Sequence, residues 1–272
     1  MQVVEANGAR IPAVGLGTLF LKGEICTRIV TAALAAGYRH IDTAQMYGNE
    51  REVGEALRAS GVPRDEVFVT TNVWWDKLAP GNFERSVEES LAKLGLSTVD
   101  LLLIHWNNPQ VPLKDSVGAL CKVKRGGLAR HVGVANFTVP LLDEAVSVAG
   151  EPLVTNQIEV HPYLDQAKVD AACARHGISV TAYCPLARGK VPGDETLARV
   201  GKRHGKSASQ IALRWLLQRG RVVIPRTSKS ERLAENLDVF GFTLGEAEMA
   251  EIDALKRPDG RLVSPPHAPR WD

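Results

Sequence analysis

Three side chains that can take part in acid–base chemistry lie at or just after the ends of short apolar runs. Asp42 closes the run RHID, Tyr47 follows five residues later, and His105 closes the run VDLLLIH. A phenol has an ordinary pKa of ~10, so Tyr47 stays protonated at neutral pH and can still donate a proton to an alkoxide. An imidazole at His105 can hydrogen-bond the same oxygen and orient a carbonyl group. These residue types therefore fit proton donation to a carbonyl oxygen.

Most of the other apolar runs also end in polar residues. In chain order the polar run ends are Asp42, Asn72, His105, Asn136, Gln157 with Glu159, Tyr183 and Arg226. A single buried His or Tyr is more often a satisfied structural residue than a catalyst. Apolar strands, however, end most simply in Gly, Pro or Ser, so we interpret the whole set as functional. That interpretation requires a fold that brings the run ends together.

The elements that must position these residues alternate along the chain. Eight apolar runs are expected as strands, at residues 13–17, 39–42, 67–71, 99–105, 131–136, 154–159, 178–183 and 222–225. Helical patterns such as 25–37, 50–61, 83–95 and 210–220 lie between them, and several stop at Gly. With no linker or break in composition, the alternation predicts one α/β domain over residues 1–272, a (β/α)8 TIM barrel. Residues just past the strand ends of such a barrel converge on one mouth.

Two features near the N-terminus bear on this fold. Asn7 and Gly8 lie between two short extended runs and predict an N-terminal β-hairpin. An open doubly wound sheet is the alternative to the barrel, and it typically carries the pattern G-x-G-x-x-G after its first strand. The segment GLGTLF supplies only the first two of those glycines, which favours a tight turn at a barrel rim.

The composition excludes several classes of partner. The 33 basic and 31 acidic residues give a formal net charge of +2, without the basic excess typical of nucleic-acid or membrane-surface binding. No apolar run approaches the ~20 residues that span a bilayer, and the first residues lack the pattern of a secretory signal. The four cysteines, Cys26, Cys121, Cys173 and Cys184, lack metal-ligand spacing and are interpreted as small buried hydrophobes. We expect a cytoplasmic protein that binds no nucleic acid, membrane or metal.

Six segments together indicate one protein family. GYRHIDTAQMYGNE, LLLIHW, GVANF, TNQIEVHPY, AYCPLARG and IPRTSKSERLAEN occur in this order and resemble the successive signatures of the aldo-keto reductases. The resemblance covers essentially the whole chain. The ending RLVSPPHAPRWD resembles the bacterial 2,5-diketo-D-gluconate reductase branch, whose members also reduce small ketoaldehydes such as methylglyoxal. The resemblance implies an oxidoreductase that uses NADPH to reduce a small aldehyde or ketone to an alcohol, and we expect a monomer.

The resemblance also implies a catalytic tetrad of Asp, Tyr, Lys and His, from which this chain departs at one position. Asp42, Tyr47 and His105 match, but the segment TTNVW places Asn72 where the family has lysine. A nearby opposite charge typically lowers the pKa of an acid by ~1–3 units, and an amide supplies no charge. Without the ammonium group, Asp42 also raises the pKa of Tyr47. We therefore expect weakened reduction, and alcohol oxidation weakened further, because oxidation needs the tyrosinate.

Other interpretations compete with a weakened reductase. Lys77 lies five residues after Asn72, but to supply the cation it would have to act from a loop rather than from a strand end. An NADPH-binding barrel with little or no catalysis, acting as a sensor or structural protein, fits the same missing charge. An aldolase that forms a Schiff base also fits a barrel, but no lysine lies at any of the expected strand ends.

Further residues match the cofactor site of the family by resemblance. Asn136 and Gln157 match the positions that bind the nicotinamide carboxamide, and Tyr183 matches the residue whose ring stacks on the nicotinamide. Arg226 and Arg232 suit a 2′-phosphate through their fork geometry, which favours NADPH over NADH. The full expected cofactor set is Asn136, Gln157, Tyr183, Leu186, Arg226, Thr227, Ser228, Arg232 and Asn236.

Aromatic residues near the catalytic positions are the expected walls of a substrate pocket. They are Phe20, Trp74 and Trp106, with core packing as the alternative for each, whereas Trp75 is expected to face elsewhere. The C-terminal tail, which includes Trp271, is a candidate cover for the mouth. His161 of EVHPY is interpreted as structural rather than catalytic.

Overall fold

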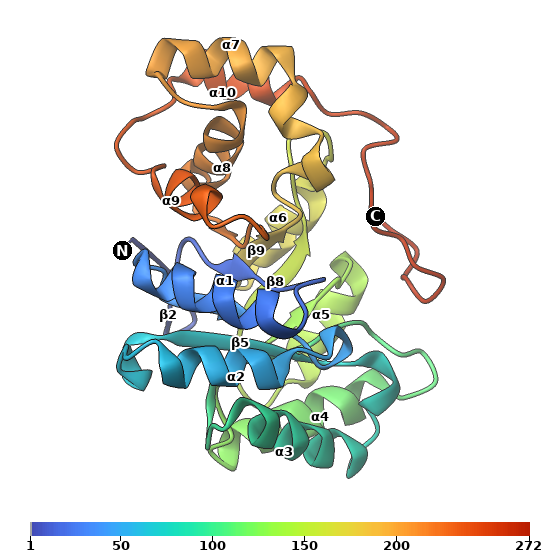
Figure 1. Ribbon diagram of the computed structural model, residues 1–272. Helices are drawn as coiled ribbons and strands as arrows, with labels where there is room; N and C mark the ends of the chain where they lie inside the picture. The colour runs from blue at the N-terminus through green and yellow to red at the C-terminus, as the bar shows by residue number, and fades with distance from the viewer. Residues whose placement is uncertain (1) are drawn as a thin grey trace.

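The computed structural model describes residues 2–272 as a ring of parallel strands surrounded by helices, with an antiparallel hairpin near the N-terminus (Figure 1). The ring strands are β3 (Leu16–Gly17), β4 (His40–Asp42), β5 (Phe68–Val73), β6 (Val99–Ile104), β7 (Ala129–Ala135), β8 (Leu153–Glu159), β9 (Ser179–Tyr183) and β10 (Val222–Val223). They pair in chain order, and each pair is parallel. Hydrogen bonds from Gly15 N to Val223 O (2.8 Å) and from Val223 N to Ala13 O (2.9 Å) close the ring. The predicted (β/α)8 barrel is confirmed.

The helices of residues 2–272 cover the outside of the ring. They are α1 (Gly23–Ala35), α2 (Glu50–Ala59), α3 (Asn82–Leu94), α4 (Leu113–Arg125), α5 (Val139–Val148), α6 (Ala167–Arg175), α7 (Glu195–His204), α8 (Ala208–Gln218), α9 (Glu231–Leu237) and α10 (Glu246–Asp253). The four helical patterns predicted at 25–37, 50–61, 83–95 and 210–220 fall on α1, α2, α3 and α8. Local signals fix several ends. Ser207 and Gln210 form a capping box at the start of α8, and Gly95 ends α3 with a left-handed φ of 66°.

The N-terminal hairpin closes one end of the barrel. Its strands are β1 (Val3–Ala6) and β2 (Ala9–Pro12), and Asn7 and Gly8 between them have φ values of 45° and 85°. Two successive positive φ values are what the two-residue turn requires, so the prediction from Asn7 and Gly8 is confirmed. Ile11 packs with Leu101 and Leu103 of β6 in a separate small core. Because Asn7 Nδ2 also donates to Leu153 O at the start of β8 (2.7 Å), the hairpin lies at the amino ends of the strands. The opposite end is the mouth.

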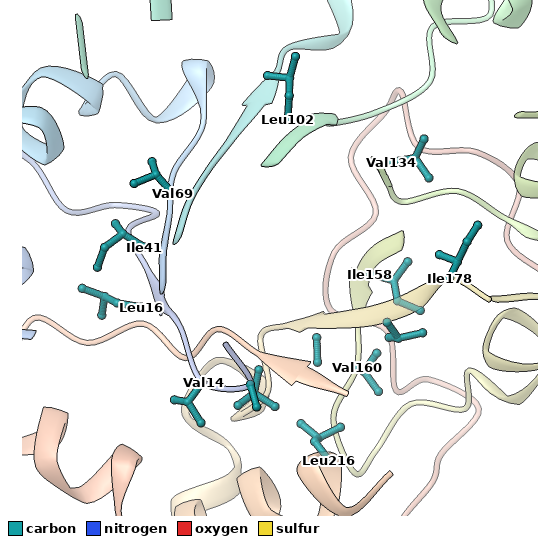
Figure 2. Close-up of a cluster of buried hydrophobic side chains, with 14 of the residues drawn as sticks. Val14, Leu16, Ile41, Val69, Leu102, Val134, Ile158, Val160, Ile178 and Leu216 are labelled. Atoms are coloured by element: carbon teal, nitrogen blue, oxygen red, sulfur yellow. The ribbon is translucent and has the colours of Figure 1, made fainter. Parts of the chain in front are cut away.

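Strand side chains alternate between the inside of the ring and the layer of helices. On β6, Leu101 and Leu103 belong to the small core with the hairpin, whereas Leu102 belongs to the large core shared with the helices. Figure 2 shows members of the large core, including Ile41 and Val69 on neighbouring strands. This double burial explains why the strands read as nearly continuous apolar runs.

Two expectations from composition can be compared with the fold. Within residues 2–272, the helices lack the length and hydropathy that a membrane crossing requires. Cys26, Cys121 and Cys173 are buried as predicted, but Cys184 is only half-buried. The prediction for Cys184 was wrong because this residue follows β9 and lies at the mouth, where it lines a cavity.

Candidate active site

A cavity of about 860 Å³ opens at the carboxyl ends of the strands. Of the residues selected from the sequence, it is lined by Phe20, Asp42, Tyr47, Trp74, His105, Trp106, Asn136, Gln157, Tyr183, Leu186, Arg226, Thr227, Arg232 and Asn236. These residues come from nearly every strand end, which share one rim because all strands of the ring run in the same direction. Asn72 and Ser228 are not among the lining residues.

Tyr47 and His105 lie in edge contact in this cavity. Their ring centroids are 5.8 Å apart with an angle of 79° between the planes. Tyr47 ends the short 3-10 helix Gln45–Tyr47 after β4, and His105 follows β6, where its backbone N donates to Val73 O (3.0 Å). The indole of Trp74 lies edge-on to the His105 ring, with the two ring centroids 5.1 Å apart. Two residues 58 positions apart in the sequence are therefore neighbours at one point of the mouth.

Burial fixes the protonation states of these two rings. Burial raises the pKa of Tyr47 well above its ordinary value of 10.0, and the nearby Asp42 carboxylate raises it further. Burial lowers the pKa of His105 to about 3, and the neighbouring His267 lowers it further. At neutral pH the phenol is therefore protonated and the His105 imidazole is neutral. The Nδ1 atom of His105 is buried without a hydrogen-bond partner.

Asn72 does not line the cavity, whereas Asp42, Tyr47 and His105 do. The Asn72 side chain is fully buried, and its Nδ2 donates to Thr43 O (2.8 Å), whereas its Oδ1 has no partner. The Asp42 carboxylate accepts a hydrogen bond from Gln157 Nε2 (2.7 Å) instead of pairing with a cation. Burial raises the pKa of Asp42 to about 7, against the opposing effect of that hydrogen bond.

Two lysines near the site do not replace the missing charge. Lys77 lies 3.8 Å from Asp76 and both side chains are half exposed, so Lys77 points to the loop surface rather than to Asp42. Lys22 donates from Nζ to the backbone carbonyl of Tyr47, not to its hydroxyl. Among residues 2–272, Asp42 forms no ion pair with a basic side chain within 4.0 Å.

Two hydrogen bonds join two of the expected nicotinamide residues, Tyr183 and Asn136, to the backbone of His105. Tyr183 Oη donates to Asn136 Oδ1 (2.7 Å), and Asn136 Nδ2 donates to His105 O (3.0 Å). Asn136 adopts a positive φ of 62° directly after β7, a conformation that Asn tolerates better than most residues. The bonds connect the strand ends of β6, β7 and β9 and hold these side chains at the cavity wall.

Arginines lie at the other end of the cavity, after β10. Arg226 Nε donates to Leu19 O (3.1 Å), and Arg232 lies in the first turn of α9. Neither guanidinium forms an ion pair with an acidic side chain of residues 2–272. Two arginines that line a cavity without acidic partners leave their positive charge available to an anion.

The C-terminal tail supplies lining residues that the sequence did not reveal. They are Leu262, Val263, Ser264, Pro265 and His267, and the loop after β9 adds Cys184 and Arg188. The His267 ring stacks on Trp75 (5.2 Å, 11°) and meets Trp74 and Trp106 edge-on, at 5.3 Å each. Trp75 itself does not line the cavity. The tail has no helical or strand pattern, so no periodic signal in the sequence gave its path.

Comparison with known proteins places the chain in a family. Residues 14–257 match the model of the aldo/keto reductase family. The chain is 44% identical over 266 residues to methylglyoxal reductase DkgB of Escherichia coli O157:H7, covering 96% of this chain and 99% of the relative. It is 43% identical over 256 residues to an aldo-keto reductase of Mycolicibacterium smegmatis, covering 94% of this chain and 90% of the relative.

Solved structures agree with this assignment. The crystal structure of a candidate 2,5-diketo-D-gluconic acid reductase B matches with a TM-score of 0.98 and 48% identity, covering 100% of this chain and 98% of that one. A Bombyx mori aldo-keto reductase in complex with NADP matches with a TM-score of 0.86 and 36% identity, covering 94% and 92% of the two chains. The chain belongs to the aldo-keto reductase family.

Proposed function

We propose that the protein is an NADPH-dependent reductase that converts small aldehydes and ketones of the methylglyoxal or diketogluconate kind to alcohols. The observation that carries the proposal is the contact between the Tyr47 phenol and the His105 imidazole in the cavity, at 5.8 Å between ring centroids. Reduction needs a protonated acid at this point, and burial keeps Tyr47 protonated. Family membership and the identity to a methylglyoxal reductase support the same function.

The side chains of the cavity fit NADPH as the cofactor. Arg226 and Arg232 suit its phosphate groups because they line the cavity without acidic partners. Tyr183 offers a ring surface, and Asn136 and Gln157 offer amide groups that both donate and accept hydrogen bonds. The cofactor supplies the hydride when it is bound. A related structure that contains NADP has the same fold.

Tyr47 and His105 act on the carbonyl oxygen in the proposed mechanism. The oxygen accepts a hydrogen bond from each, and Tyr47 donates its proton as negative charge develops on that oxygen. The neutral His105 orients the carbonyl without competing as an acid, because its pKa is lowered to about 3. Trp74 and Trp106 line the same cavity and limit the access of water to the reacting group.

Asn72 limits the rate in this proposal. A nearby cation typically lowers the pKa of an acid by ~1–3 units. A cation beside Tyr47 would therefore favour the tyrosinate by roughly 1.4–4 kcal/mol. Asn72 supplies no charge, and its amide is bonded to Thr43 O. Reduction starts from the protonated phenol and keeps part of its rate, whereas alcohol oxidation starts from the tyrosinate and loses more.

The test is steady-state consumption of NADPH with methylglyoxal, together with a fluorescence titration of NADPH binding. We expect tight NADPH binding and slow but measurable turnover that depends on the carbonyl concentration. A folded protein that consumes no NADPH in the presence of methylglyoxal would contradict the proposal.

A second candidate function is an NADPH-binding barrel with little or no catalysis, acting as a sensor or structural protein. It is favoured by one observation, that the buried Asp42 carboxylate pairs with an amide and not with a cation. NADPH binding without turnover, not repaired by a lysine at position 72, would support this candidate over the reductase.

The proposed reductase acts as a monomer in the cytoplasm. The four free thiols fit a reducing compartment.

A further inference from the structure

The end of β8 carries a buried carboxylate that the proposed reaction does not use. Glu159 Oε1 accepts hydrogen bonds from Leu262 N (2.7 Å) and from His161 Nε2 (2.9 Å), and Glu159 Oε2 accepts one from Val263 N (2.9 Å). The side chains of Glu159 and His161 are both 0% exposed. A buried carboxylate is costly unless its oxygens are hydrogen-bonded, and these three donors satisfy both oxygens.

His161 presents a fixed donor to this carboxylate. Its Nδ1 accepts from Tyr163 N (3.3 Å), so the ring hydrogen is on Nε2, the atom next to Glu159. The backbone of Glu159 is also held, because Gln166 Nε2 donates to its carbonyl (2.8 Å). The loop after β8 is therefore a rigid support for the carboxylate, which agrees with the structural role expected for His161.

The tail that Glu159 binds also contacts the barrel at other points, among them Val139 N, which donates to Asp272 Oδ2 (3.0 Å), and Asp165, which lies 3.3 Å from Lys256. The tail contains neither helix nor strand after α10, and its two bonds to Glu159 join residues 103 and 104 positions apart. Just before them, Arg257 N donates to Tyr163 O (3.0 Å). Gly260 passes so close to this carbonyl that a Cβ would lie 1.9 Å from it. The loop after β8 thus fixes the point at which the tail turns toward the cavity.

Beyond this turn the tail forms part of the cavity wall. Leu262 and Val263, the two residues bonded to Glu159, line the cavity themselves. Farther on, His267 lies against the indoles of Trp74, Trp75 and Trp106. Because Trp74 also contacts His105 (5.1 Å), the tail reaches the surroundings of the proposed catalytic pair.

We propose that Glu159 is a positioning residue that fastens the C-terminal tail over the cavity and thereby sets the affinity for the carbonyl substrate. This inference rests on the proposed function. Glu159 acts through the backbone of Leu262 and Val263, not through contact with the reacting atoms. Its loss therefore raises KM through a displaced wall and leaves the proton donor in place.

The test compares Glu159→Gln with Glu50→Gln. Glutamine keeps the shape of the side chain but replaces one acceptor oxygen with an NH2 group that faces a backbone N–H. Glu50 is a matched control, because it is 2% exposed and accepts from Thr71 Oγ1 (2.7 Å) without contacting the tail. We expect Glu159→Gln to raise KM for methylglyoxal at least tenfold and to change kcat less than threefold, whereas Glu50→Gln stays within twofold in both.

Limited trypsin digestion gives a readout that is independent of activity. Release of the peptide 262–270 from the native protein requires the tail to leave the barrel, and mass spectrometry measures its rate. We expect release at least ten times faster in Glu159→Gln than in wild type or Glu50→Gln. A folded Glu159→Gln protein that lacks either effect, the higher KM or the faster release, overturns the proposal.

A change on the other side of the contact covers the case in which Glu159→Gln does not fold. Val263→Pro removes the N–H that bonds Glu159 Oε2 and leaves the buried carboxylate in place. This variant should also show a higher KM and a faster release of the peptide 262–270. If both variants fold, the KM and the peptide-release rate of the double variant should exceed those of either single variant by no more than twofold, because both substitutions break the same contact. A wild-type protein that consumes no NADPH overturns the proposed function and the effect on KM, while the release rates still decide whether Glu159 fastens the tail.

Discussion

Gln157 donates a hydrogen bond of 2.7 Å to the Asp42 carboxylate across the mouth of the barrel. Asp42 ends β4 and Gln157 lies in β8, so the bond joins strands that are not neighbours in the ring. The amide satisfies an oxygen of this buried acid, which forms no ion pair with a basic side chain of residues 2–272. The same amide is the one that we propose for the carboxamide of the cofactor, so we predict that the missing charge at position 72 affects both catalysis and cofactor binding.

Replacing Asn72 with Lys should raise kcat for methylglyoxal reduction at least tenfold, equivalent to about 1.4 kcal/mol of barrier. The ammonium group pairs with Asp42, lowers the pKa of Tyr47 and frees Gln157. Asn72→Met is the control, because methionine lengthens the side chain without adding a charge. Its kcat should stay within threefold of the wild-type value. Steady-state NADPH consumption measures both variants. An unchanged kcat in a folded Asn72→Lys protein would refute the role assigned to this position.

Replacing Tyr47 with Phe should lower kcat by roughly 100–10,000-fold, the usual contribution of a general acid. NADPH affinity, measured by fluorescence titration, should change less than threefold, because only the hydroxyl is lost. Tyr38→Phe is the matched control. Its buried hydroxyl donates to Leu233 O (3.1 Å) outside the cavity, so its removal should lower stability by about 1 kcal/mol and leave kcat within twofold. More than a tenth of wild-type kcat in Tyr47→Phe would exclude this phenol as the proton donor.

The barrel and its polar rim could be predicted because their signals are local. The run 99–105 is apolar from Leu101 to Ile104 and has one buried acid, Asp100, near its start, and the polar residue His105 follows where the strand ends. The arrangement around Asn72 could be predicted only in part. The sequence shows that a charge is absent, but the short amide reaches Thr43 O instead of the cavity, a choice that depends on the neighbouring strand.

The tail could not be predicted for a different reason. Its path depends on two backbone hydrogen bonds to Glu159 and on the packing of His267 against three indoles. Both are contacts between residues more than 100 positions apart, and neither leaves a period in the sequence. His161, in contrast, was interpreted as structural from its motif, and its bond to the buried Glu159 gives a physical reason for that interpretation.

Replacing Arg226 and Arg232 with Ala should weaken NADPH binding at least tenfold more than NADH binding. Both side chains line the cavity without acidic partners, and a 2′-phosphate is the charge that distinguishes the two cofactors. Arg85→Ala is the control, because Arg85 is exposed on α3 and does not line the cavity. Fluorescence titrations with both cofactors give the four dissociation constants. Equal losses for NADPH and NADH would refute the assignment of these arginines to the 2′-phosphate.

Asp42 should make the protein less stable as pH rises from about 4 to about 8. Its pKa is raised by burial from 3.8 to about 7 in the folded protein, so the folded state holds this proton more tightly than the unfolded state. The resulting stability is fully present below the unfolded pKa and is lost as pH rises through the folded pKa. Asp42→Asn keeps an acceptor for Gln157 but cannot ionise. Its stability relative to wild type should therefore increase by on the order of 4 kcal/mol between pH 4 and pH 8. Urea denaturation across this pH range measures the free energy of unfolding of both proteins. If this free energy depends on pH in the same way for Asp42→Asn and wild type, Asp42 is ionised at little cost in the folded state and the prediction is wrong.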